Sequence, residues 1–348
     1  MITKSPPRHH LNCTQATQPQ WMHDLRHACR DPLQLCQQLG LDPAHWPGGL
    51  EAMQAAMQDF PLRVPQAFIA RMRQGDPQDP LLLQVLPQGL EHQSPDHYLL
   101  DPLQETGQST PPGLLHKYAS RVLVTLTGAC AIHCRYCFRR HFPYAEAKSG
   151  DEALDQLVNY CVQHPDINEV VLSGGDPLMW PDERLAHWTA ALAALPQIKR
   201  LRCHTRLPVV LPSRVDDKLL SWLEASPVRQ VWVIHCNHPQ EIDASVRQAL
   251  ADLQAAGVQL LNQAVLLKGI NDCPQTLASL SEGLFEAGVM PYYLHMLDPV
   301  KGAAHFDIDE AEAKNLYAQL LALLPGYLVP KLVREVPGQP AKTPLGGC

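Results

Sequence analysis

The chain has 348 residues, of which 45% are hydrophobic, and a formal net charge of −7. That length and hydrophobic content suit a barrel-like α/β fold built as one large domain with additions. The negative charge argues against a nucleic-acid-binding surface. No apolar stretch reaches membrane-spanning length, and the N-terminus lacks the apolar segment of a signal peptide. Eleven cysteines without secretory features indicate a reducing compartment, by default the cytoplasm.

Residues 1–110 are rich in proline and glutamine and contain short helical patterns such as GGLEAMQAAMQDF. We expect an irregular helical N-terminal region there, packed on a core formed by residues 111–325. Residues 326–348 form a separate C-terminal segment in this division.

Within the core, short β-branched runs alternate with amphipathic helical stretches. The predicted strands span residues 121–127, 169–174, 200–205, 230–235, 259–265 and 290–296. The predicted helices span residues 151–163, 182–194, 240–256, 275–287 and 309–323. Six strand–helix units predict an α/β fold in which a parallel sheet curls into an open, partial (β/α)6 barrel with helices on one face. In such sheets the chemistry gathers at the C-terminal ends of the strands.

The first predicted strand leads into Cys130, Cys134 and Cys137, which have C-x3-C-x2-C spacing around the aromatic Tyr136. Three thiolates on one loop can hold three irons of a [4Fe–4S] cubane and leave the fourth iron open. A structural zinc site would want a fourth ligand at short spacing, and none follows. Three ordinary buried cysteines remain the alternative, which this spacing disfavours. The motif is similar to the signature of the radical S-adenosyl-L-methionine (SAM) enzymes.

The second predicted strand ends in SGGDPL, which contains Ser173, Gly174, Gly175 and Asp176. Glycines let backbone groups approach a ligand closely, and Asp176 can accept from a ligand ammonium. Alone, such a segment is more often a tight turn than a site. Behind the cysteine motif, it resembles the glycine-rich element by which radical SAM enzymes hold the amino group of SAM.

The C-terminal segment carries Lys342 in a Gly/Pro-rich loop, where a lysine is normally solvated. Pyridoxal 5′-phosphate (PLP) needs a lysine at a flexible position, and Lys301 and Lys331 are the nearby competitors for that role. Here a wider resemblance becomes specific, because several motifs occur in the same order as in the lysine 2,3-aminomutase family. These motifs are HKYASRVL, CRYCFRRHFPYAE, SGGDPL, HTRLPVVLPSR, LNQAVLLKGINDC, PYYLHMLDPVKGAAHF and AKTPL. The similarity is greatest to the bacterial branch that makes (R)-β-lysine for modification of translation elongation factor P.

The resemblance implies three cofactors: a [4Fe–4S] cluster on the cysteine motif, SAM and PLP. Lys342 occupies the place of the lysine that binds PLP covalently. Tyr118 and Arg121 match residues that contact PLP, and the guanidinium of Arg121 suits its phosphate. His235 and Gln263 match positions close to SAM.

The resemblance also implies a lysine-binding site. Arg139 matches the arginine that pairs with the substrate carboxylate, whereas the adjacent Arg140 is expected to be solvated. Asp298 matches an acid that receives the distant ammonium, with a helix cap as its alternative. Glu335 takes the place of a second such acid, which ordinary aminomutases write as aspartate, with a surface charge as its alternative.

The function implied is isomerisation of L-lysine to (R)-β-lysine, with an external electron donor of the flavodoxin or ferredoxin type and a link to elongation factor P and its lysyl ligase. An aminomutase of another amino acid, such as ornithine or glutamate, is the first alternative. Asp298 and Glu335 argue against glutamate, whose side-chain carboxylate they would repel. A non-enzymatic iron–sulfur scaffold or nucleic-acid-binding cluster protein is the second alternative, and it leaves Lys342 and SGGDPL unexplained.

The other cysteines are expected to be small buried hydrophobic residues. Cys273 matches a cysteine that clostridial-type enzymes use for zinc, together with three cysteines in a C-terminal tail. This chain has only Cys348 beyond Lys342, so we expect no structural zinc. The remaining cysteines with the same expected burial are Cys13, Cys29, Cys36, Cys161, Cys203 and Cys236.

Overall fold

The structure is a computed structural model and describes residues 18–105, 113–143 and 150–346. A single nine-stranded sheet forms its centre, and the strands follow one another in chain order. Strands β2 to β8 run parallel to one another. At the two edges, β1 pairs antiparallel with β2 and β9 pairs antiparallel with β8. The strands are β1 (Leu114–Tyr118), β2 (Arg121–Thr127), β3 (Glu169–Gly174), β4 (Arg200–Thr205), β5 (Arg229–Ile234), β6 (Gln259–Val265), β7 (Met290–His295), β8 (Lys331–Arg334) and β9 (Thr343–Pro344).

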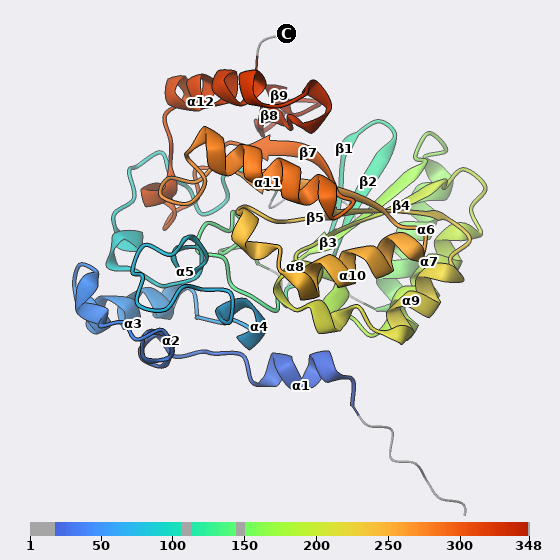
Figure 1. Cartoon of the computed structure of the whole chain (residues 1–348). Helices are drawn as coiled ribbons and strands as arrows, with labels where there is room; N and C mark the ends of the chain where they lie inside the picture. The colour runs from blue at the N-terminus through green and yellow to red at the C-terminus, as the bar shows by residue number, and fades with distance from the viewer. Residues whose placement is uncertain (1–17, 106–112, 144–149, 347–348) are drawn as a thin grey trace, which may run out of the picture.

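The helices that connect the parallel strands lie along the outside of the curved sheet (Figure 1). They are α6 (Asp151–Gln163), α7 (Asp182–Ala193), α8 (Leu207–Val210), α9 (Asp217–Glu224), α10 (Ala244–Ala255), α11 (Pro274–Glu286) and α12 (Glu310–Leu323). Five short helices precede the sheet: α1 (Gln20–Arg26), α2 (Pro32–Gln38), α3 (Gly49–Asp59), α4 (Gln66–Ile69) and α5 (Pro80–Leu83). The described residues also form 3-10 turns: η1 (Pro43–His45), η2 (Gly89–His92), η4 (Pro177–Met179), η5 (Pro212–Arg214), η6 (Pro239–Glu241), η7 (Ala304–Phe306) and η8 (Gly326–Leu328).

The predicted parallel α/β architecture is confirmed. The strands predicted at 121–127, 169–174, 200–205 and 259–265 have the observed bounds. β5 begins and ends one residue earlier than predicted, and β7 ends one residue earlier. The prediction missed β1, β8 and β9. These strands are short, and they carry charged residues or proline in place of an apolar run.

Alternation along β4 shows how the sheet sorts its residues. Leu201, Cys203 and Thr205 are buried, whereas Arg202 and His204 lie on the opposite face. Successive side chains of a strand point to opposite faces, so one face of β4 meets the outer helices and the other faces the inside of the barrel. This alternation places polar and charged groups inside the barrel.

The N-terminal helices belong to the same hydrophobic cluster as the sheet. In Figure 1 they lie against one end of the barrel. Buried Arg135, in the loop after β2, bonds to Glu91 of η2 at 2.8 Å and to the carbonyl of Phe60 at 2.6 Å. The N-terminal region is therefore anchored on the loop that carries the cysteine motif.

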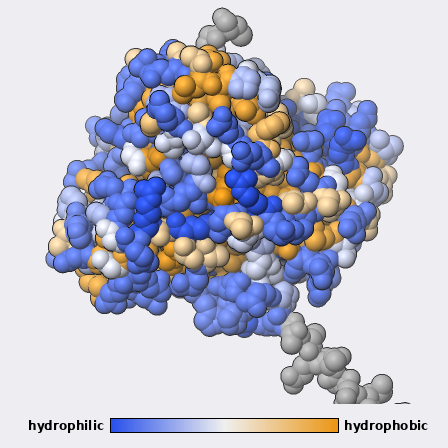
Figure 2. Space-filling view, viewed as in Figure 1, coloured by the Kyte–Doolittle hydropathy of each residue, from blue (hydrophilic) through white to orange (hydrophobic). Residues whose placement is uncertain are grey.

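The face shown in Figure 2 is mainly hydrophilic, with a hydrophobic area towards the top, over α12. Leu321 and Leu323 of α12, Tyr327 of η8 and Phe285 of α11 are exposed. Among the described residues, no helix is both long and apolar enough to span a membrane.

Candidate active site

The cysteine motif forms an irregular loop directly after β2. Cys130, Cys134 and Cys137 are half-buried free thiols, and the Cys137 N–H donates to the Cys134 carbonyl at 3.0 Å. Burial and the neighbouring Cys134 together raise the pKa of Cys137 to about 11. Burial likewise raises the pKa of Cys130, with added contributions from Cys137, Asp176 and Cys134. Within the described ranges no three His, Cys, Asp or Glu side chains converge on one metal-ion position. A cubane binds each thiolate through a different iron, so three separate thiols on one loop fit a cluster better than a single ion.

The glycine turn after β3 supports this loop. The N–H groups of Gly175 and Asp176 donate to the carbonyls of Thr127 and Ala129, at 2.6 and 2.9 Å. A Cβ on Gly174, whose φ is 120°, would lie 2.4 Å from the Thr127 oxygen, and one on Gly175 would lie 2.4 Å from the Ala129 oxygen. Only glycine allows this approach. In the structure, the two glycines allow a close approach of the backbone at Thr127 and Ala129, where β2 leads into the cysteine loop.

Asp176 is buried at the junction of β3 and β4. Its carboxylate accepts from the Thr205 hydroxyl at 2.8 Å and from the N–H groups of Arg206 and Leu178 at 2.8 and 3.0 Å. Burial raises the pKa of Asp176 to about 6, and these hydrogen bonds oppose the rise. The carboxylate therefore fixes the C-terminal end of β4 against the glycine turn.

His235 and Gln263 meet next to the cysteine loop. His235 Nδ1 donates to the Gln263 carbonyl at 2.8 Å, and its Nε2 lies 2.8 Å from the Tyr136 hydroxyl. Burial and the charge of Arg206 lower the pKa of His235 to about 4. The imidazole is therefore neutral at pH 7, and its Nε2 accepts from Tyr136.

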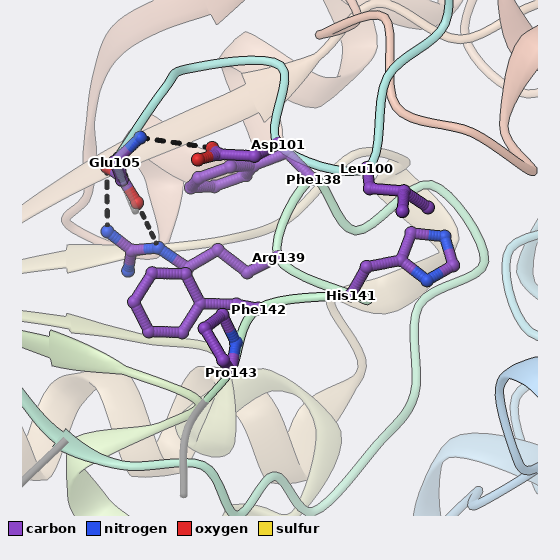
Figure 3. Close-up of a pocket in the computed structure, with 8 residues that line it drawn as sticks. All are labelled: Leu100, Asp101, Glu105, Phe138, Arg139, His141, Phe142 and Pro143. Atoms are coloured by element: carbon purple, nitrogen blue, oxygen red, sulfur yellow. Dashed lines mark hydrogen bonds and ion pairs between the residues drawn. The ribbon is translucent and has the colours of Figure 1, made fainter. Parts of the chain in front are cut away.

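Arg139 leaves the cysteine loop towards a pocket of about 250 Å³ (Figure 3). Its Nε and Nη2 donate to the two carboxylate oxygens of Glu105 at 2.9 and 3.1 Å, and its Nη1 donates to the Ser173 hydroxyl at 3.0 Å. The Glu105 N–H in turn donates to Asp101 at 3.0 Å. Arg139 thus forms a two-pronged pair with a carboxylate, the geometry that an amino-acid carboxylate would use. The sequence analysis missed Glu105, which lies in a segment without a recognisable motif.

Strand pairing brings Lys342 to Glu335. Arg334 of β8 pairs with Thr343 of β9, so the next residues on each side, Glu335 and Lys342, face each other across the hairpin. Lys342 Nζ lies 2.6 Å from Glu335 Oε2, and Lys117 of β1 contacts the other carboxylate oxygen. Burial opposes ionisation of Glu335, but the two lysines outweigh it and lower the pKa of the carboxyl. Glu335 is therefore not a surface charge.

Lys117 is a lysine of this site that the sequence analysis did not consider. The two competitors that it did consider, Lys301 and Lys331, are exposed. A lysine in the exposed register of an edge strand gives no sequence signal of its own, because such residues are common there.

An aromatic ring lies beside the Lys342 amine. Its Nζ lies 5.6 Å from the ring centre of Tyr293 in β7. Tyr118 and Arg121 pair across the β1–β2 turn, with the guanidinium 3.6 Å from the Tyr118 ring centre. Burial and the hydroxyl of Tyr292 raise the pKa of Tyr293. Tyr118 adds to this rise, whereas the positive charge of Arg121 opposes it. The two predicted PLP contacts and Lys342 thus lie around one tyrosine.

Asp298, just beyond β7, has no ion pair among the described side chains. Burial raises its pKa to about 7. Lys342 and Arg139 oppose this rise, whereas Glu335 and Glu105 add to it. Since these effects need proximity, all five charged groups surround the same part of the barrel.

Several buried polar atoms of the strands have no hydrogen-bond partner in the described part of the chain, among them Thr125 Oγ1, His204 Nε2 and His295 Nε2. Burial lowers the pKa of His204, with Arg202 and Lys342 adding to the effect. Burial and Lys342 also lower the pKa of His295. Buried polar atoms normally have partners, so these neutral imidazoles near Lys342 suit a polar ligand inside the barrel.

Comparison with known proteins decides the family. A sequence model of the Radical SAM superfamily matches residues 124–233. The L-lysine 2,3-aminomutase of Escherichia coli is 47% identical over 97% of this chain and 97% of its own length, and that of Haemophilus influenzae is 46% identical over 93% and 94%. The L-lysine 2,3-aminomutase of Clostridium subterminale is 34% identical over 85% of this chain and 71% of its own. The chain belongs to the lysine 2,3-aminomutase family.

This aminomutase is therefore a radical SAM enzyme of the isomerase class, and its family implies a [4Fe–4S] cluster and SAM. The donor set fits a cluster, because three free, half-buried thiols share one loop. The Lys342 side of the barrel also suits PLP, since it offers an amine, a guanidinium and imidazoles with an unpartnered nitrogen.

Two expectations about individual residues are wrong. Arg140 is not solvated: its side chain is 2% exposed and donates to Glu91 at 2.7 Å and to the Gly302 carbonyl at 3.1 Å. Cys273 is exposed rather than buried, and it lies directly before α11, at the N-terminal end of that helix. Burial is confirmed for Cys29, Cys36, Cys161, Cys203 and Cys236, whereas Cys13 and Cys348 lie outside the described residues.

Proposed function

We propose that this aminomutase converts L-lysine to (R)-β-lysine by moving the amino group from carbon 2 to carbon 3, with a [4Fe–4S] cluster, SAM and PLP as cofactors. The observation that carries the proposal is the buried Asp298 carboxyl, which lies close enough to Lys342, Glu335 and Arg139 for all three charges to act on it. A diamino acid has one carboxylate and two amino groups, and these residues supply a cation, two acids and a cofactor lysine. Opposite charges at separate points would fix the substrate in one orientation.

The cluster is proposed to bind Cys130, Cys134 and Cys137, with SAM against the glycine turn, His235 and Gln263. When bound, the cluster and SAM supply a 5′-deoxyadenosyl radical, and PLP supplies a ring that delocalises the spin of the migrating group. The protein's own task is to orient the substrate and to exclude water and stray hydrogen donors.

On the opposite side, Lys342 is proposed to bind PLP covalently, and Arg121 to pair with its phosphate. Arg139 would exchange Glu105 for the substrate carboxylate, a replacement of one carboxylate by another in the same two-pronged geometry. Asp298 would receive the distal ammonium, which supplies the cation that this buried carboxyl lacks.

Glu335 is proposed as the second acid for the distal ammonium. Both of its oxygens contact lysines, so a substrate ammonium must replace one of them. Lys342 is the lysine that moves away, because its nitrogen is required by PLP, and Lys117 then keeps the carboxylate in place. Glutamate is one methylene longer than aspartate, and this length lets its carboxylate contact both Lys117 of β1 and Lys342 beside β9.

We further propose that the (R)-β-lysine serves modification of elongation factor P through a lysyl ligase, in the cytoplasm, with an electron donor of the flavodoxin or ferredoxin type. Support comes from the resemblance of the motifs to that branch of the family and from the nine free cysteines of the described residues, which suit a reducing compartment.

The test is anaerobic purification followed by iron and sulfide analysis, an absorbance spectrum and assays with lysine, ornithine and glutamate. We expect cluster and PLP absorbance together, and turnover of lysine to a product that chiral chromatography identifies as (R)-β-lysine. Preferential turnover of ornithine would reject lysine as the substrate. A cluster without bound PLP and without turnover of any amino acid would reject the aminomutase mechanism.

A further inference from the structure

A buried arginine, Arg206, contacts one of the proposed cluster ligands. It follows β4 directly, and its side chain is 7% exposed. Its Nη1 donates to Cys134 Sγ at 2.7 Å and to the Tyr136 hydroxyl at 2.7 Å. One guanidinium nitrogen thus holds two side chains of the cysteine loop.

The other terminal nitrogen binds acceptors on the opposite side. Arg206 Nη2 donates to Gln84 Oε1 at 2.6 Å and to Glu241 Oε2 at 2.9 Å. Glu241 is fully buried, and its second oxygen accepts from the N–H groups of Asn237 and His238 at 3.0 and 3.1 Å. Burial opposes ionisation of Glu241, but Arg206 and these hydrogen bonds together lower its pKa. The guanidinium therefore cannot rotate away from the thiol without breaking a buried ion pair.

The N-terminal helices help to hold this arginine. Gln84 follows α5 and also donates to Glu241 at 3.1 Å, and the Phe68 ring of α4 lies 5.5 Å from the Arg206 guanidinium carbon. Part of the N-terminal region thus reaches the cluster loop through Arg206.

We propose that Arg206 is a positioning residue that orients the Cys134 thiolate and raises the reduction potential of the cluster. Reduction adds one electron, supplied by the external donor, to a cluster bound by three anionic thiolates. A fixed positive charge and an N–H donor at one sulfur stabilise the more negative, reduced form. The inference rests on the proposed binding of the cluster at Cys130, Cys134 and Cys137.

The test is a redox titration of the reconstituted holoenzyme, followed by electron paramagnetic resonance of the reduced cluster. At the wild-type midpoint potential, Arg206→Gln is expected to lower the ratio of reduced to oxidised cluster at least tenfold, equivalent to about 59 mV for one electron. Glu241→Gln removes the counter-charge of Arg206, so it is expected to shift the midpoint in the opposite, positive direction.

Arg214→Gln is the matched control. Arg214 is likewise buried and paired with an acid, Asp182 at 2.6 Å, but within the described residues it donates to Asp182 and to the carbonyls of Leu178 and Trp180. Its loss should lower the melting temperature without shifting the potential. A merely structural role for Arg206 predicts the same result for Arg206→Gln.

An Arg206→Gln enzyme with the wild-type iron content and an unchanged or more positive potential would overturn the inference. Where Arg206→Gln does not retain a cluster, Arg206→Lys and Glu241→Gln decide: an unchanged potential in both variants also overturns it. Absence of a cluster from the wild-type enzyme would instead reject the proposed function, so the two failures are distinguishable.

Discussion

The two sides of the barrel treat their buried polar groups differently. Around Arg206, both terminal guanidinium nitrogens and the hydroxyl of Tyr136 have partners. Around Lys342, His204 Nε2 and His295 Nε2 have none among the described residues, and Asp298 has no cation at bonding distance. The first side, called the completed side below, leaves only Arg206 Nε of these groups without a partner in the described residues, so its network fixes side chains before any ligand arrives. The second side, called the open side below, carries the cost of unpartnered polar groups, and a charged ligand would offset that cost.

The largest effect is expected from removal of a proposed cluster ligand on the completed side. Cys134→Ala should lose iron and all cleavage of SAM, because three ligands leave no spare. Cys203→Ala is the control: Cys203 is fully buried in β4, away from the short-spaced motif, and its loss should leave the iron content unchanged. Equal iron loss in the two variants would contradict the assignment.

Removal of the Lys342 amine, on the open side, should separate the chemistry of the cluster from that of PLP. Lys342→Ala is expected to keep its iron and sulfide but to lose PLP absorbance and aminomutase activity. The exposed Lys331 provides the control, since Lys331→Ala should retain both. Borohydride reduction and peptide mapping of the wild-type holoenzyme check the assignment, and a label on Lys117 or Lys331 in place of Lys342 would overturn it.

A smaller loss is expected when one acid of the open side is neutralised. Asp298→Asn should weaken lysine binding by about 1.5–3 kcal/mol, the range for a hydrogen bond to a charged group, or roughly 10- to 150-fold. Iron content and spectral binding of SAM should not change. Lysine kinetics identical to those of the wild type would remove Asp298 from the substrate site.

The pH dependence of substrate binding should reveal the same carboxyl. Since burial raises the pKa of Asp298 to about 7, the group gains a proton as the pH falls through 7 and then offers no charge to an ammonium. Apparent affinity for lysine is therefore expected to fall between pH 8 and pH 6 in the wild type. The Asp298→Asn variant should show a flatter profile, and an equally steep one would assign the titration to another group.

The smallest predicted effect concerns stability. The folded-state pKa of Asp298 lies above its ordinary value of 3.8, so the ionised carboxylate destabilises the folded state at higher pH, and this penalty is complete above about pH 7. In the cofactor-free protein, Asp298→Asn should raise the melting temperature at pH 8 by roughly 2 °C, the order expected for 1 kcal/mol in a large domain. The difference should shrink towards pH 4. A variant that is less stable than the wild type at pH 8 would show that the ionised Asp298 carboxylate stabilises the folded state.

The completed side was the more predictable from sequence. Cysteine spacing and the SGGDPL turn are local patterns, and the strands before them have β-branched or alternating residues that specify their bounds. Tyr136 could be singled out in the same way. Its partner Arg206 could not, because the burial of an arginine depends on Gln84 and Glu241, which are distant in the chain.

The open side was predicted mainly through resemblance. Nothing local to Lys342 distinguishes it from a solvated lysine, and its pairing with Glu335 follows from the register of β8 and β9, two strands that the periodicity did not reveal. Lys117 and Glu105 were missed for the same reason, since each meets its partner only through long-range packing. Arg140 was misjudged because its burial requires Glu91 of the N-terminal region.

The contact between Lys117 and Glu335 has a consequence for folding. It joins β1 to the residue that follows β8, positions 218 apart in the chain. Such a long loop is costly to close until the intervening strands have paired, so this contact forms late in folding. The hairpin that carries Lys342 can pair with β7 before this happens, so Glu335 is expected to gain its second lysine partner only when the two ends of the sheet meet.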